Sequence, residues 1–232
     1  MTIDQDRDSE DAARAARLLE GLAVPAVACV ALAAPEDSPA PDEREARLVA
    51  GASPRRIADF LSGRACARAA LQKLGLPAEP ILSGPSREPL WPEGIVGSIT
   101  HCAGLSAAAV ARRADISALG IDAERTVVSA DLEEMILSPS ECRLMPPQDE
   151  DARQVLRSLL FSIKESVFKC VFPATRIYVD FREVSVTLSG DDRFVAEISA
   201  GLAVPDRFRA IAGRYASTRN FVVSLAQIAA TP

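Results

Sequence analysis

A long helix followed by antiparallel strands is predicted twice along the 232 residues, and few architectures accommodate that order. The first helix begins at Ser53 and Pro54, which suit a cap and a first turn, and it ends at Gly75. The second covers residues 151–172, where apolar residues recur every three or four positions, as a buried helix face requires. Because strands follow the helix in each half, the order predicts an α+β fold and not a doubly wound parallel sheet.

The expected strands divide the chain into two halves. One strand is expected before the first helix, three after it and four after the second, at residues 24–33, 95–100, 106–112, 116–124, 184–188, 194–199, 207–215 and 221–228. The join is predicted near residues 125–130, so the halves are residues 1–125 and 126–232. No residue-level repeat relates them, so any duplication is structural. Residues 1–20 are expected to form a frayed terminus or a short helix.

Composition limits the partners and the kind of metal site. The net charge of −6 argues against a general affinity for nucleic acid. The start of the chain lacks the features of a signal peptide, and the longest apolar stretch, residues 22–34, is shorter than the about 20 residues that cross a bilayer. A soluble protein without a membrane partner is therefore expected. The five cysteines form no C-x-x-C pair, which fits a reducing cytoplasm. Since His101 is the only histidine, a metal site must be rich in carboxylates, which suits magnesium.

Asp122 and Glu124 form a candidate cation site. Alternate side chains of a strand share a face, so these two acids point to one side while Ile121 and Ala123 face a core. Two neighbouring carboxylates repel each other unless a cation or a proton neutralises one of them. Two readings stay open at this point: a hard divalent ion held by both acids, or two acids solvated at the end of a strand.

Glu165 and Lys169 lie one turn apart on the second helix, away from its buried face. Surface pairs of this kind are common and stabilise a helix by only about 0.3–0.5 kcal/mol. The alternative reading makes Glu165 a third metal ligand or a base, with Lys164 and Lys169 steadying phosphate charge. His101 ends a strand beside small residues, where it is structural, donates to a phosphate or relays a proton.

Basic residues also gather on the first helix. Arg56, Arg64 and Arg68 are separated by multiples of four and share one stripe. This pattern fits an anionic ligand or a solvated helix face, and alone it favours the solvated face. The sequence contains no G-x-x-x-x-G-K-[ST] loop, no G-x-G-x-x-G turn and no G-x-S-x-G elbow.

Taken in order, these segments resemble one family. The stretches REPLWPEGIVGSITHCAG, ALGIDAE and FSIKESVFKCVFP are similar to 4′-phosphopantetheinyl transferases of the enterobactin-synthetase component D type. The stretch RRIADFLSGRACARAALQKLG is similar to the N-terminal helix of that class. The resemblance covers residues 55–180, and the order and spacing of four motifs make it specific. It implies an enzyme that moves the phosphopantetheine arm of coenzyme A to a serine of an acyl or peptidyl carrier protein and releases 3′,5′-ADP.

The resemblance also implies a fold and a metal site. The fold would be a pseudodimer of two similar α+β halves, each a long helix on a small antiparallel sheet, with the active site in the cleft between them. Asp122, Glu124 and Glu165 would hold Mg²⁺ on the pyrophosphate of coenzyme A. Glu165 would accept the proton of the carrier serine, while Lys169 and His101 supply positive charge.

Further residues are implied to bind coenzyme A. Lys164 and Lys169 would contact its phosphates, as would His101 with the Ser98 and Thr100 of its S-x-[ST]-H element. Arg56 and Arg64 would meet the 3′-phosphate side.

Two positions depart from the family pattern. Ser162 stands where the family has an aromatic residue, and Phe161 beside it is expected to supply the missing bulk. Arg87 is the only cation in a loop where many members carry a lysine.

The resemblance implies a role in siderophore or secondary-metabolite biosynthesis, and two fused halves imply a monomer. The alternative from another class is a non-catalytic module that binds coenzyme A or a nucleotide. Such a module would use Arg56, Arg64 and His101 but would not need three acids, so the joint presence of the acids favours the enzyme. A third alternative is another Mg²⁺-dependent phosphotransferase.

Overall fold

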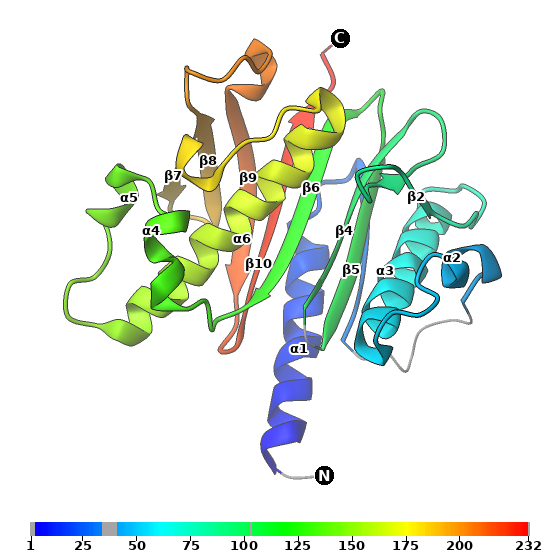
Figure 1. Cartoon of the computed structure of the whole chain (residues 1–232), viewed down its shortest axis with the longest axis horizontal. Coiled ribbons are helices and arrows are strands. Elements are labelled where there is room, and N and C mark those ends of the chain that lie inside the picture. The colour runs from blue at the N-terminus through cyan, green and yellow to red at the C-terminus, as the bar shows by residue number, and fades with distance from the viewer. Residues whose placement is uncertain (1–2, 34–40, 103, 232) are drawn as a thin grey trace.

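The computed structural model describes residues 3–33, 41–102 and 104–231, whose strands form two antiparallel sheets side by side (Figure 1). The smaller sheet has the order β1-β5-β4, the larger one β6-β10-β9-β8-β7, and β2 pairs with β3 in a hairpin. The strands are β1 Val27–Leu32, β2 Leu82–Ser83, β3 Pro89–Leu90, β4 Ile95–Cys102, β5 Leu105–Arg112, β6 Ile116–Arg125, β7 Val184–Ser189, β8 Arg193–Ile198, β9 Ala210–Ser217 and β10 Phe221–Ala229.

Each sheet carries one long helix, which confirms the α+β class (Figure 1). Helix α3 packs on β1, β4 and β5 of the smaller sheet, and α6 packs on β6 and β10 of the larger one. Within the described residues every helix is too short or too polar to cross a membrane. The helices are α1 Ile3–Leu22, α2 Glu43–Arg47, α3 Pro54–Lys73, α4 Glu133–Ile136, α5 Pro139–Cys142 and α6 Glu150–Thr175.

Local sequence explains where the two long helices begin and end. The side chain of Ser53 accepts a hydrogen bond from the backbone N–H of Arg56, and Pro54 occupies the first turn of α3. Asp149 caps α6 in the same way through the backbone N–H of Ala152. Helix α6 continues past the predicted end at residue 172 and stops at Arg176, whose left-handed φ of 59° closes the last turn.

The N-terminal segment differs from the expected frayed or short element. It is a 20-residue helix, α1, that runs behind both sheets and contacts β1 and β5 of one sheet and β9 and β10 of the other (Figure 1). Its buried residues are small or apolar and recur at helical spacing: Ala12, Ala15, Ala16, Leu19 and Leu22. Alanine at these positions lets the helix approach two sheets at once. Because the segment is rich in acidic residues, this narrow apolar stripe is difficult to recognise from the sequence alone.

The two sheets meet along a seam between β4 and β6. The Ser98 hydroxyl accepts a hydrogen bond of 3.1 Å from the backbone N–H of Ile121, and the Thr100 hydroxyl accepts one of 3.2 Å from that of Ala123. Strand β6 itself pairs with β10, so by hydrogen bonding it belongs to the larger sheet. The division into units of residues 1–125 and 126–232 stays a prediction.

Helix α6 lies unusually close to β6 at Gly120. A Cβ atom at this position would overlap the carbonyl oxygen of Ser166, so only glycine permits the approach. Ser162, one turn earlier, is fully buried and its hydroxyl lies 3.0 Å from that of Ser224 on β10. This close contact is possible because small side chains line both elements.

Candidate active site

Asp122 lies at the centre of the seam, on β6. Its side chain is 2% exposed, and its Oδ1 atom accepts hydrogen bonds from Lys169 Nζ at 2.6 Å and from the Thr100 hydroxyl at 3.1 Å. The Oδ2 atom is buried and has no hydrogen-bond partner in the described residues. A buried carboxylate oxygen without a partner is costly, so this atom marks a position suited to a cation.

Glu124 and Glu165 complete the acidic set. Burial, with the charges of Asp122 and Glu165, raises the pKa of Glu124 to about 7. Burial likewise raises the pKa of Glu165, and the charge of Asp122 adds to the rise while Lys169 opposes it. Glu165 Oε2 lies 3.9 Å from Lys169 Nζ. The three acids therefore interact electrostatically, with Lys169 among them.

The donor chemistry of this set fits a hard divalent cation. Carboxylate oxygens are the ligands that Mg²⁺ prefers, and Asp122 Oδ2 is a buried carboxylate oxygen without a hydrogen-bond partner in the described residues. Burial and the charge of Asp122 raise the pKa of Glu124 although Lys169 opposes the rise, so a further cation would stabilise its carboxylate form. The described residues nevertheless contain no group of three or more His, Cys, Asp or Glu side chains already arranged to hold a metal. The metal assignment of Asp122, Glu124 and Glu165 thus stays a proposal.

Arg56 and His101 meet at the α3 side of the seam. Arg56 Nη1 lies 3.1 Å from His101 Nε2, so the neutral imidazole accepts from the guanidinium. Burial lowers the pKa of His101, and the charges of Arg56 and Lys169 lower it further. The charge of Asp59 raises this pKa and so partly opposes the shift. The pair presents cationic and hydrogen-bonding groups where α3 and β4 approach each other, as expected for an anion site.

Arg64 does not join that pair. Its side chain is buried, donates to the Ser83 hydroxyl at 3.0 Å and lies 4.4 Å above the ring of Phe60. Burial lowers the pKa of Arg64 to about 10. The expected contact with the 3′-phosphate is therefore not supported by the geometry, because the guanidinium packs between α3 and β2.

Ser98 and Thr100 make structural contacts that the sequence did not predict. Both are buried, and their hydroxyls bond the backbone of β6, with Thr100 bonding Asp122 as well. They hold the two sheets together and orient Asp122. Ser98 also lines the cavity described below, so its expected contact with coenzyme A, like that of Thr100, stays a prediction.

The position of Lys164 differs most from the expectation that this residue binds coenzyme A. Its Nζ atom lies 2.6 Å from Glu141 Oε2 and donates to the carbonyl oxygens of Ile136 and Phe181, and its side chain is 0% exposed. The lysine points away from the seam, although it adjoins Glu165 in sequence, since neighbours on a helix face different directions. Lys164 ties α6 to the segment after β6 and is not placed to bind coenzyme A.

The expectation that Phe161 supplies the bulk of the missing aromatic residue stays a prediction. Its ring packs edge-on against Phe181, with centroids 5.4 Å apart. Ser162 occupies the tight contact between α6 and β10, where an aromatic side chain would not fit. Arg87 is exposed at the tip of the β2–β3 hairpin with a left-handed φ of 64°, and it lines a cavity that Lys169 also lines.

That cavity, of about 440 Å³, adjoins Lys169 and is lined by the β2–β3 hairpin, β4, α6 and the loop after α6. Its lining is mostly apolar and consists of Ser86, Arg87, Glu88, Pro89, Gly97, Ser98, Ile99, Phe168, Lys169, Phe172, Pro173 and Tyr178. We call it the aromatic pocket, after Phe168, Phe172 and Tyr178. The sequence reading missed these residues, although Phe168 and Phe172 are spaced one turn apart beside Lys169.

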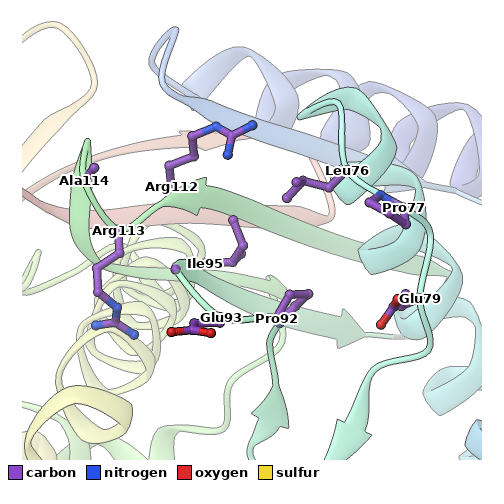
Figure 2. A pocket seen from close by; sticks show the side chains of 10 residues that line it. Leu76, Pro77, Glu79, Pro92, Glu93, Ile95, Arg112, Arg113 and Ala114 are labelled. Carbon is purple, nitrogen blue, oxygen red and sulfur yellow. The ribbon is translucent and has the colours of Figure 1, made fainter.

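A second cavity, of about 360 Å³, lies at the other end of β4 and β5 (Figure 2). Arg112 and Arg113 come from the end of β5, while Glu93 and Ile95 lie at the start of β4. None of the predicted site residues lines it, so it is separate from the acidic seam.

Acidic side chains, cationic groups and a mostly apolar pocket occur together at this seam, an arrangement compatible with an enzyme that acts on a phosphate-containing ligand. Residues 44–111 match the 4′-phosphopantetheinyl transferase N-terminal domain, and residues 118–226 match the 4′-phosphopantetheinyl transferase superfamily. The chain belongs to the 4′-phosphopantetheinyl transferase family, whose reaction is the transfer of phosphopantetheine from coenzyme A to carrier proteins.

Individual relatives agree with this assignment. The chain is 41% identical to 4′-phosphopantetheinyl transferase Svp of Streptomyces mobaraensis, over 80% of this chain and 78% of the relative. It is 36% identical to 4′-phosphopantetheinyl transferase PptT of Mycobacterium tuberculosis, over 79% of this chain and 84% of the relative. It is also 37% identical to enterobactin synthase component D of Salmonella typhi, over 50% of this chain and 48% of the relative. The resemblance inferred from the motifs is thereby confirmed.

Proposed function

We propose that coenzyme A lies along the seam, with its phosphates between the Arg56–His101 pair and Lys169. The observation that carries the proposal is the buried Asp122 Oδ2 atom without a partner, beside two acids of raised pKa. Asp122, Glu124 and Glu165 would hold Mg²⁺ there. When bound, the ion supplies positive charge that neutralises the pyrophosphate.

The reaction moves one phosphoryl-linked group between two oxygens. The serine oxygen of the carrier forms a bond to the β-phosphorus of coenzyme A, and the bond from that phosphorus to the bridging oxygen breaks, so that 3′,5′-ADP leaves. Glu165 accepts the serine proton directly or through water, because its side chain is 26% exposed and its pKa is raised.

Positive charge on the protein stabilises the developing oxyanions. Lys169 remains protonated because the charges of Asp122 and Glu165 outweigh the burial that would remove its proton, and its pKa is raised. Neutral His101 and cationic Arg56 bind phosphate oxygens as hydrogen-bond donors once the ligand replaces their mutual contact. Positioning and electrostatics suffice, so no covalent enzyme intermediate is needed.

The aromatic pocket would receive the pantetheine arm. Coenzyme A combines a polyanionic nucleotide with an arm that carries no charge, and the site has a cationic end and a mostly apolar end. Lys169 stands at the junction of the two, where the pyrophosphate links nucleotide and arm. The exposed Arg87 at the mouth of this pocket is the candidate for the loop cation of the family.

Finer features of the assembly follow from this arrangement. We propose that the two sheets with their helices α3 and α6 are duplicated halves, that the active site lies in the cleft between them, and that the chain acts as a monomer. The similarity to enterobactin synthase component D favours carrier domains of siderophore or other secondary-metabolite synthetases as acceptors. A non-catalytic module is not favoured, since it would need neither Glu165 nor the acid pair.

Mass spectrometry of an apo-carrier after incubation with the protein, coenzyme A and Mg²⁺ tests the proposal. The carrier should gain one phosphopantetheine group, and Asp122→Asn should abolish the gain while its circular dichroism spectrum stays native. Arg219→Gln, a change at an exposed residue outside the seam, serves as a control. A fully active Asp122→Asn enzyme would remove the metal assignment.

A further inference from the structure

The tip of the β2–β3 hairpin is a tight turn that fixes one carboxylate. The N–H of Gly84 donates to the carbonyl of Glu88 at 2.8 Å, and that of Arg87 donates to the carbonyl of Gly84 at 2.9 Å. The Glu88 side chain folds back over this turn and accepts from the N–H of Ser86 at 2.9 Å. A Cβ on Gly84 would lie 2.6 Å from the Glu88 carboxylate, so glycine makes the fold-back possible.

From this turn Glu88 reaches across the seam to the end of α6. Its Oε1 atom lies 2.6 Å from Arg176 Nη1, and the side chains are 9% and 56% exposed respectively. Arg176 is itself held in place: its N–H donates to the carbonyl of Phe172 at 2.8 Å, and its guanidinium lies 5.8 Å from that ring. One ion pair thus joins a hairpin that precedes β4 to the helix of the larger sheet.

The aromatic pocket lies between the two elements that this pair connects. The hairpin supplies Arg87, Glu88 and Pro89, and α6 with the following loop supplies the aromatic wall. Phe168 stacks on Phe172 with centroids 5.2 Å apart and meets Tyr178 edge-on at 5.4 Å, so the three rings of that wall support one another. The hairpin, by contrast, contains only two paired residues in each strand. The position of the hairpin therefore determines the width of the pocket.

We propose that the Glu88–Arg176 ion pair is a latch that limits the size of the group carried on the thiol of the coenzyme A substrate. The proposal rests on the proposed function, in which the pantetheine arm enters the aromatic pocket. An acyl thioester extends the arm by apolar carbons that need additional room between hairpin and aromatic wall. With the latch closed, free coenzyme A and short acyl groups fit; with the latch open, longer chains do.

The chemistry of the pair suits a latch that opens. Arg176 is more than half exposed, so salt screens its attraction to Glu88, and such pairs contribute only modest free energy. Opening is therefore accessible to a substrate that supplies apolar contacts of its own. Added salt should shift the enzyme towards long acyl substrates.

The experiment compares Glu88→Gln, Arg176→Gln and the double variant with the wild type, and Arg176→Lys is the conservative control. For each protein, kcat/KM is measured with coenzyme A and with acyl-coenzyme A of increasing chain length. The ratio for long acyl chains over coenzyme A should rise about fivefold in each Gln variant, which corresponds to about 1 kcal/mol. The double variant should show the same rise as each single variant, because both changes break one ion pair; independent effects would multiply. Arg176→Lys should behave like the wild type.

Calorimetric Kd values for the same ligands without carrier should follow the same ratios. Unchanged ratios in both Gln variants, or effects that multiply in the double variant, would overturn the latch. Transfer from coenzyme A by the wild type distinguishes failure of the latch from failure of the proposed function. If transfer occurs and the ratios do not move, only the latch fails; if the wild type transfers from neither substrate, the proposed function fails and the latch with it.

Discussion

Lys169 Nζ lies 2.6 Å from Asp122 Oδ1 and 3.9 Å from Glu165 Oε2, so one ammonium bridges acids from β6 and α6. The Thr100 hydroxyl, from the other sheet, bonds the same Asp122 oxygen. Charge balance at the site therefore depends on contacts among three elements. Any change that removes this ammonium should alter both phosphate binding and the protonation of the acids.

Lys169→Met should lower kcat/KM with coenzyme A by about 100-fold or more, the loss typical of removing a preorganised charge at a developing oxyanion. The same change should raise the pKa of Glu124 and Glu165 further, because Lys169 lowers both. Carbon-13 NMR of the labelled carboxyl groups would measure the pKa shifts. Lys73→Met, at a half-exposed lysine on α3, is the matched control and should leave kcat/KM within about twofold.

Glu124 should make metal-free stability decrease between about pH 4.5 and 7. Its pKa of about 7 exceeds that of an ordinary glutamate, so the folded state retains a proton that the unfolded state releases over this range. Mg²⁺ should consequently raise the Tm more at pH 8 than at pH 6, where it competes with that proton. Thermal denaturation with and without Mg²⁺ measures both effects. In Glu124→Gln the pH dependence of the Mg²⁺ effect should shrink; an unchanged dependence would assign it to another group.

Lys164→Met should destabilise the protein by about 3–5 kcal/mol, because it leaves the buried Glu141 carboxylate without its charge partner. Urea denaturation gives the free energy of unfolding. Adding Glu141→Gln should recover part of the loss, because it removes the unpaired buried charge. Its amide oxygen can keep only one of the two bonds that the backbone N–H groups of Ser138 and Val186 donate to the two carboxylate oxygens, so the recovery should be incomplete. If Lys164 contacted coenzyme A instead, the folded double variant would show a strongly raised KM, and we expect KM to stay within about twofold.

Gly120→Ala should be among the most harmful single-methyl additions in the chain. The new Cβ would overlap the Ser166 carbonyl and push α6 away from β6, at a cost of about 1–3 kcal/mol or more. The displaced helix should also reduce kcat, because α6 carries Glu165 and Lys169. Gly21→Ala is the matched control: no atom lies within 4 Å of its added Cβ, and stability should stay constant or rise slightly.

Sequence periodicity and motif order predicted much of this protein. The apolar spacing on α6, the Ser-Pro start of α3 and the alternation around Asp122 depend on neighbours within a few residues, so they are visible in the chain itself. The motif order was specific enough to identify the family. The full length and the packing of helix α1 were not predicted, because an acidic surface and a narrow alanine stripe carry a weak helical signal.

The direction of each charged side chain was decided only by tertiary structure. Lys164 and Lys169 look equivalent in the motif, yet one is buried against Glu141 and the other meets Asp122. Arg56 and Arg64 share a stripe, yet only Arg56 reaches His101. The physical reason is that burial and ion pairing depend on partners distant in sequence. The sequence determined which groups the protein has, and long-range packing determined which of them face the seam.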